Sequence, residues 1–155
     1  MANRFSTMCG ASAIIRSFLE SLASSASALP DTLKSSSPIK NALNILVKNG
    51  TPKKNIEILH CVTQYPASND NLNLKSIQFI KDKINLPVGY SDHSLGYEAS
   101  LIAIGLGAKV IEKHFTLNKN QIGPDHKSSL NPEELVEYIK KIRQAEKSLG
   151  QYLKQ

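Results

Sequence analysis

The chain has 155 residues, of which 41% are apolar and 21% are charged, with eight glycines, seven prolines and two cysteines. This composition suits one domain of ordinary size or part of a larger one, and it excludes collagen-like, disulfide-rich and wholly disordered chains. No uninterrupted run of about 18 apolar residues occurs, so the sequence predicts no membrane-spanning helix.

The formal net charge of +6 favours anionic partners but does not choose among them. Lysines alternate with Asn, Asp or Glu in separate segments, and no Arg-rich run or aromatic-threaded basic stretch is present. We therefore expect a solvated lysine surface and no nucleic-acid partner. Cys9 and Cys61 form no disulfide framework, which favours a reducing, cytoplasmic location and buried thiols.

Residues 1–38 differ in character from the rest and contain 10 of the 18 serines. Apolar side chains between Ala11 and Leu22 recur at helical spacing, which predicts an amphipathic helix followed by a Ser-rich linker from Ser24 to Pro38. A targeting peptide is an alternative for this stretch because it combines Arg4 and Arg16 with many serines. We expect a divergent leader over 1–38 and one domain over 39–155.

From residue 39 onward the period of the apolar pattern alternates between helix and strand. The last helix has the clearest boundaries, since Asn131 is a good N-cap, Pro132 suits the first helical position and Gly150 marks the end. In chain order the pattern predicts a helix over 39–47, a strand over 55–62, a helix over 74–84, a strand over 87–90, a helix over 99–106, a strand over 109–115 and a helix over 131–149.

Such alternation, in units of roughly 25 residues, is typical of parallel strands covered by helices. Parallel strands need both faces and both edges protected, and three strands do not provide this. The sequence therefore predicts an α/β fold that is a slice of a larger parallel sheet or barrel.

In parallel α/β folds, reactive side chains gather where the strands end. His93 and His114 follow consecutive predicted strands, which lie about 5 Å apart in a sheet. Two such imidazoles can bind a divalent ion, or they can form a hydrogen-bonded pair without metal, and their spacing leaves both readings open. Asp92 and Glu112 are candidate ligands, carboxylates that orient the imidazoles, or ion-pair partners of Lys113.

Three further polar residues are candidates for binding or for a structural role. Asp125 lies in a Gly-Pro loop that suits hydrogen bonding to a polyol, although a turn-forming role is favoured from the sequence alone. Tyr65 either packs on the mouth of a barrel or binds a ligand. His60 lies inside a predicted strand and is expected to be structural.

Four motifs make the sequence similar to a known family. Segments 60–66 (HCVTQYP), 87–93 (PVGYSDH), 110–116 (VIEKHFT) and 123–127 (GPDHK) resemble the N-acetylneuraminate (sialic acid) synthase family, which includes the legionaminic acid synthases. The resemblance runs from about Ile39 to Gly150, with the motifs in the family's order and spacing.

The resemblance implies a (β/α)8 barrel of which this chain supplies roughly the last three strand–helix units. It also implies a reaction in which phosphoenolpyruvate condenses with an open-chain N-acylated amino sugar, typically N-acetylmannosamine, to give a nine-carbon sialic acid and phosphate. A divalent metal, Mn²⁺ or Mg²⁺, assists this reaction. The matched site residues are His93 and His114 as catalytic metal ligands, Ser91 toward phosphoenolpyruvate, Thr63 toward its phosphate, and Tyr65 and Asp125 toward the sugar.

Parts of the family pattern have no match in this sequence. The lysines and the essential acidic residue of the family's first half-barrel lack counterparts, as does its C-terminal antifreeze-like domain. We therefore expect a truncated form without synthase activity on its own, which exposes apolar surface and associates. A non-catalytic half-barrel that completes a site with another chain is the first alternative, and a basic binding protein without enzymatic activity is the second.

Overall fold

The computed structural model describes residues 4–5, 13–18, 37–123 and 125–150. The strands are β1 (Arg4–Phe5), β2 (Ala13–Phe18), β3 (Ile56–Cys61), β4 (Val88–Asp92) and β5 (Val110–Lys113). The helices are α1 (Ser37–Lys48), α2 (Ser76–Lys83), α3 (Glu98–Gly105) and α4 (Pro132–Leu149), with short 3₁₀ turns at Lys53–Asn55 and Asn69–Asn71. None of the described helices is both long and apolar enough to cross a membrane.

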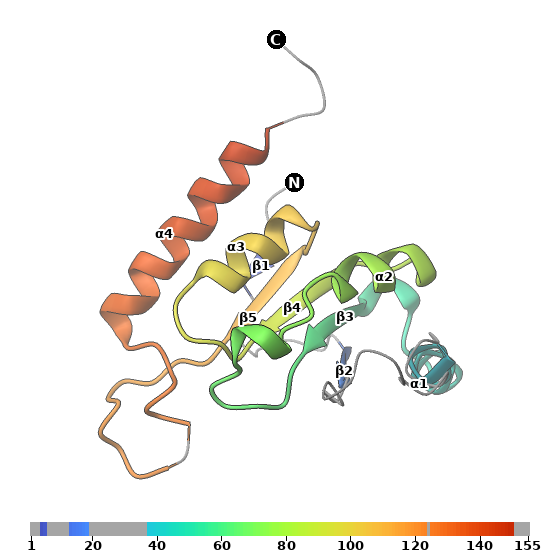
Figure 1. Ribbon diagram of the computed structural model, residues 1–155. Helices are drawn as coiled ribbons and strands as arrows, with labels where there is room; N and C mark the ends of the chain where they lie inside the picture. The colour runs from blue at the N-terminus through green and yellow to red at the C-terminus, as the bar shows by residue number, and fades with distance from the viewer. Residues whose placement is uncertain (1–3, 6–12, 19–36, 124, 151–155) are drawn as a thin grey trace.

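The strands form one parallel sheet in the order β1-β5-β4-β3-β2 (Figure 1). Strands β3, β4 and β5 are the three that the sequence predicts, and α1 to α4 are the four predicted helices, each within a few residues of its expected bounds. The fold is therefore α/β with a parallel sheet, as expected.

The prediction of a helix between Ala11 and Leu22 is wrong for the described part of that stretch, because Ala13–Phe18 is strand β2. It pairs with β3 along its whole length, from Ala13 opposite Ile56 to Phe18 opposite Cys61. The open edge of β3 offers backbone groups that need partners, and this tertiary pairing outweighs a helical pattern of apolar residues. The Ser-rich linker lies mostly outside the described residues, and α1 crosses the predicted boundary at residue 38.

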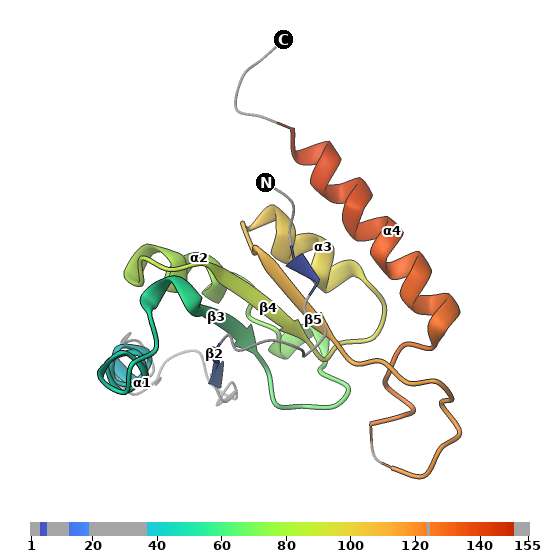
Figure 2. The same cartoon turned by 180° about the vertical axis from the view of Figure 1, so that it is seen from behind.

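One face of the sheet carries the apolar core. Helices α2 and α3 lie over this face in Figure 1, and the view from behind in Figure 2 shows the opposite face of β3, β4 and β5. The core side chains come from the sheet and from all four helices, and they include Ile56, Ile58, Ile77, Ile80, Tyr90, Ala103, Ile111, Tyr138 and Ile142. Their burial sets which residues of each strand face the helices, so the alternate residues face the other way.

Helix α4 begins after the N-cap that the sequence predicts, Asn131, which forms a capping box with Glu134. The Asn131 side chain accepts a hydrogen bond from the Glu134 backbone N–H at 2.8 Å, and the Glu134 carboxylate accepts one from the Asn131 N–H at 2.9 Å. Lys119 forms an ion pair with the same carboxylate, which lowers the pKa of Glu134. These contacts satisfy backbone donors that a helix start leaves free and define the residue at which α4 begins.

The face opposite the core is closely packed around Gly89. A Cβ atom at this position would lie 2.5 Å from Leu59 Cδ2 and 2.6 Å from the Val110 carbonyl oxygen, so only glycine lets the three strands approach this closely.

We expect Gly89→Ala to destabilise the fold by about 1–3 kcal/mol. The matched control is Gly105→Ala, whose Cβ meets nothing within 4 Å and which should stabilise α3 by up to ~1 kcal/mol. Equal urea midpoints for the two variants would contradict this packing.

The buried imidazole of His60 should make the stability of the fold depend on pH. Its Nε2–H donates to the Leu72 carbonyl at 2.7 Å, and Nδ1 has no hydrogen-bond partner among the described residues. Burial lowers the pKa of His60 below 6.5, and the bond to Leu72 only partly offsets this. The unfolded chain binds a proton at His60 more readily than the folded chain does. The contribution of His60 to the free energy of unfolding is therefore complete above about pH 6.5 and is lost as the pH falls below that value.

We therefore expect the free energy of unfolding to drop between pH 7 and pH 5, with a slope from this residue of at most ~1.4 kcal/mol per pH unit. In His60→Gln, which keeps a donor for Leu72 and does not titrate, the slope should be shallower. Urea unfolding at several pH values measures both slopes, and an identical slope in the variant would show that His60 is not responsible.

Candidate functional site at the carboxyl end of the sheet

The carboxyl ends of β3, β4 and β5 meet at one end of the sheet because the strands are parallel. The register sets Cys61 opposite Ser91, Ser91 opposite Glu112 and Asp92 opposite Lys113. Since consecutive side chains of a strand point to opposite faces, the polar residues here divide into two groups. One group surrounds His93 and His114, and the other surrounds Asp92 and Lys113.

His93 and His114 lie side by side, as the sequence predicts. Their ring centroids are 5.0 Å apart and the ring planes are inclined by 54°. His93 is 6% exposed, whereas His114 is half-buried. Each is the first residue after its strand, so the pairing of β4 with β5 brings them together.

Hydrogen bonds fix the proton position on His93. Its Nδ1 lies 2.6 Å from the Val62 carbonyl oxygen, which can only accept, so Nδ1 carries the hydrogen. In the neutral ring the lone pair therefore belongs to Nε2, which lies 2.8 Å from the Tyr65 hydroxyl and 3.2 Å from Ser91 Oγ. Donation of one ring N–H to a backbone carbonyl is the arrangement that prepares the other nitrogen to bind a metal.

Tyr65 covers both imidazoles. Its ring centroid lies 3.9 Å from that of His93 and 4.5 Å from that of His114, in stacked geometry. Its side chain is nevertheless 42% exposed, so it forms the solvent side of the pair. Tyr65 thus packs against the two imidazoles, and its binding of a ligand stays a prediction.

Ser91, Glu112 and Cys61 lie on the same face as the imidazoles. Ser91 Oγ donates to Glu112 Oε1 at 2.7 Å, and Cys61 Sγ lies 3.6 Å from His93 Nε2. Cys61 is a buried free thiol, as expected. The Glu112 carboxylate is thus held two residues before His114, oriented by a serine hydroxyl.

Asp92 and Lys113 form an ion pair on the opposite, helix-covered face. Lys113 Nζ lies 3.2 Å from Asp92 Oδ2, and the two side chains are 2% and 0% exposed. Burial lowers the pKa of Lys113, and the negative charge of Asp92 counteracts this. Among the readings of Asp92, the ion pair with Lys113 is therefore the one that the structure contains.

Tyr138 and Ser100 join this ion pair and were not predicted from sequence. Both donate to Asp92 Oδ2, at 3.1 Å and 2.6 Å respectively, and their own oxygens are 2.5 Å apart. Burial and the charge of Asp92 raise the pKa of Tyr138, which keeps its hydroxyl protonated as a donor. Helical periodicity shows only that Tyr138 lies on a buried face, so no sequence signal connects it to Asp92.

A cavity of about 350 Å³ lies beside this second group. Ser94, Lys113 and Tyr138 line it together with residues of the loop before α4, whereas His93 and His114 do not. The cavity is therefore on the helix side of the sheet, behind the imidazole pair.

Thr63 and Asp125 stand apart from the contacts around the imidazoles. Both are exposed, and the Asp125 backbone carbonyl accepts hydrogen bonds from the Ser129 amide at 3.0 Å and the Ser129 hydroxyl at 2.7 Å. These backbone contacts match the turn-forming reading of Asp125. The substrate roles expected for both residues stay predictions.

The donor set fits a divalent cation with two protein nitrogens. The Nε2 lone pair of His93 and the neighbouring imidazole of His114 lie together, and the described residues contain no group of three or more His, Cys, Asp or Glu side chains arranged to hold a metal ion. A cation bound by these two imidazole nitrogens would take its remaining ligands, which are oxygen atoms, from water or substrate.

Comparison with known proteins decides the family. A model described as the NeuB family matches residues 30–154. The chain belongs to the NeuB family. The resemblance to sialic acid synthases is thereby confirmed, and the NeuB match begins nine residues before Ile39.

Individual relatives agree. The N,N'-diacetyllegionaminic acid synthase of Campylobacter jejuni is 54% identical over 116 residues, which are 75% of this chain and 35% of that protein. The human N-acetylneuraminate-9-phosphate synthase is 41% identical over 102 residues, which are 65% of this chain and 28% of that protein. This NeuB-family chain thus spans about a third of the length of the curated relatives it matches.

The fold is shared as well. The crystal structure of an N-acetylneuraminic acid (sialic acid) synthetase from Leptospira borgpetersenii superimposes with a TM-score of 0.69 at 38% identity, over 78% of this chain and 41% of that one. The α/β fold with a parallel sheet is thus that of a sialic acid synthase structure.

Proposed function

We propose that this chain carries the metal-binding end of a synthase that condenses phosphoenolpyruvate with an N-acylated amino sugar, such as N-acetylmannosamine, to give a nine-carbon sialic acid and phosphate. The observation that carries the proposal is the pair of imidazoles, His93 and His114, 5.0 Å apart where adjacent parallel strands end. Relatives named as legionaminic acid and N-acetylneuraminate-9-phosphate synthases support this reaction class.

We also propose that the sheet belongs to a (β/α)8 barrel, of which β3, β4 and β5 with α2, α3 and α4 are consecutive units. Two features support this placement. Helices α2 and α3 cover one face of these strands, and α4 packs against α3. The register places the imidazole pair on the other face at the carboxyl end, where barrel enzymes place their active sites.

In this proposal His93 and His114 hold Mn²⁺ or Mg²⁺. Such an ion supplies Lewis-acid stabilisation of the negative charge that develops on the aldehyde oxygen of the acceptor sugar. The protein's part is to keep His93 in the correct tautomer, through its bond to Val62, and to present Nε2 to the site. Tyr65 OH, which contacts Nε2 at 2.8 Å, has to leave that nitrogen when the ion binds.

The other residues would bind and orient the substrates. Ser91 contacts phosphoenolpyruvate once its hydroxyl turns away from Glu112, since phosphoenolpyruvate offers only acceptor oxygens. Thr63 binds the phosphate, and Tyr65 and Asp125 hold the sugar. Their contribution is positioning, which lowers the entropic part of the barrier and needs no proton transfer.

We expect the 155-residue chain to need further protein for activity, because it corresponds to about a third of its relatives' length. Exposed apolar side chains after β5, among them Phe115 and Leu117, suit association with a copy of the chain or with a missing half-barrel. We place the protein in the cytoplasm, where a buried free thiol such as Cys61 persists.

The metal site is tested by calorimetric titration with Mn²⁺. We expect one ion to bind per chain, and His93→Ala or His114→Ala to weaken its affinity by more than tenfold because each removes a ligand. The control is His126→Ala, since His126 bonds to Thr116 at 2.7 Å and does not belong to the pair. Wild-type chain that binds no Mn²⁺, or a His126 variant as weak as the others, would contradict the site.

The reaction is tested by incubating the chain with phosphoenolpyruvate, N-acetylmannosamine and Mn²⁺ and measuring sialic acid. We expect no product from the chain alone. Product should appear when a separate polypeptide supplies the remaining barrel of a relative, and it should fall more than a hundredfold when this chain carries His93→Ala. Product from the chain alone would disprove the need for further protein, and undiminished product with His93→Ala would disprove the role of His93.

A further inference from the structure

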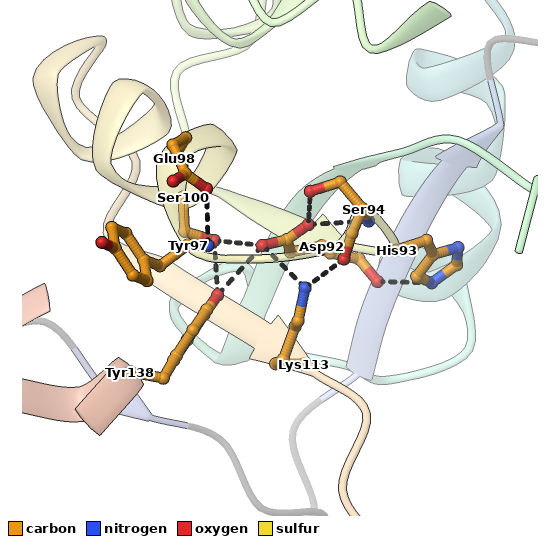
Figure 3. A network of polar contacts seen from close by, with 9 residues as sticks. Asp92, His93, Ser94, Tyr97, Glu98, Ser100, Lys113 and Tyr138 are labelled. Carbon is orange, nitrogen blue, oxygen red and sulfur yellow. Dashed lines mark hydrogen bonds and ion pairs between the residues drawn. The ribbon is translucent and has the colours of Figure 1, made fainter. Parts of the chain in front are cut away.

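The polar group behind the imidazoles is organised around one buried carboxylate. Asp92 Oδ1 accepts from the Ser94 amide at 2.9 Å and the Ser94 hydroxyl at 2.6 Å, while Oδ2 accepts from Ser100 and Tyr138. Figure 3 shows these groups converging on Asp92 while the His93 ring points away from them. Every donor but Lys113 thus comes from the loop after β4, from α3 or from α4.

Lys113 contacts both residues that flank His93. Its ammonium group forms the ion pair with Asp92 and donates to the Ser94 carbonyl oxygen at 2.5 Å. The ammonium also lies over the Tyr138 ring, 5.5 Å from its centroid. The backbone of His93 is therefore held from both sides by one side chain of the neighbouring strand.

The same lysine directly precedes His114. Asp92 and Lys113 are register partners of β4 and β5, so the next residues along the two strands, His93 and His114, are brought to the same level on the opposite face. A slip of one strand past the other would break the ion pair and separate the imidazoles together. The position of the His93–His114 pair is thus coupled through the backbone to that of the Asp92–Lys113 ion pair.

We infer that Asp92 and Lys113 are positioning residues for the His93–His114 pair, with Ser100 and Tyr138 anchoring Asp92 to the two helices. The inference deepens the proposed function, on which it rests for the identity of the bound ion. Outer partners of metal ligands commonly change metal affinity by 10–100-fold. This network acts through the strand ends, from the face opposite the imidazoles.

The test uses the full chain and two measurements. The first is the nuclear Overhauser contact between ring protons of His93 and His114 without metal, and the second is Mn²⁺ affinity by calorimetry. We expect Asp92→Asn, which is nearly isosteric, and Lys113→Met, which keeps most of the stem, to lose the contact and to weaken Mn²⁺ binding by at least tenfold.

A control separates positioning from general loss of stability. Ile142→Val shortens a side chain that is 2% exposed on the same helix as Tyr138, and it leaves every polar group of the network unchanged. We expect it to lower the unfolding midpoint and to leave the ring contact and the Mn²⁺ affinity unchanged. Folded Asp92→Asn or Lys113→Met protein with wild-type values of both measurements would overturn the inference.

A milder variant decides the matter if those two do not fold. Tyr138→Phe keeps the ring over Lys113 and removes only the hydroxyl that anchors Asp92, so the Mn²⁺ affinity should fall by a few-fold and the ring contact should weaken. Unchanged values in folded Tyr138→Phe protein would then overturn the inference. Wild-type chain that fails to bind Mn²⁺ would disprove the metal site, while the ring contact, measured without metal, would still report on the positioning.

Discussion

The parallel register of β4 and β5 is the constraint on which the candidate site depends. It sets Asp92 opposite Lys113 and thereby His93 opposite His114, so one backbone arrangement determines two side-chain pairs. Coulomb attraction between buried charges is offset by the cost of removing them from water, and it becomes favourable only when their remaining hydrogen-bonding capacity is filled. Here Ser94, Ser100 and Tyr138 donate the hydrogen bonds that the Asp92 carboxylate can still accept beside its ion pair with Lys113.

One face of the sheet contains the residues that stabilise the fold, and the other contains the candidate site. The helix-covered face contains the apolar core and the ion pair, both shielded from water. The opposite face contains the imidazoles, and hydrogen bonds to Val62 and Tyr65 orient that of His93. Close packing at Gly89 draws β3, β4 and β5 together below the site. A rigid support of this kind is what a small set of converging ligands needs.

Much of this arrangement could be predicted from sequence because its causes are local. Apolar runs predict β3, β4 and β5, and the cap at Asn131 predicts the start of α4, while strand ends predict that His93 and His114 are neighbours. Strand β2 could not be predicted, since its partner β3 lies some forty residues away and its own pattern is helical. The roles of Ser100 and Tyr138 depend likewise on contacts between distant segments, which no periodicity records.

The hydrogen bond between Tyr138 and Asp92 spans 46 positions of the chain and has a consequence for biosynthesis. A ribosome delivers β4 and β5 before α4, so during translation the Asp92 carboxylate is enclosed without one of its donors. The carboxyl end of the sheet reaches its final geometry only after the last helix has emerged and docked. The site is therefore complete only when that helix has been synthesised. A nascent chain stalled before residue 138 contains both histidines but lacks the hydrogen bond from Tyr138 to Asp92.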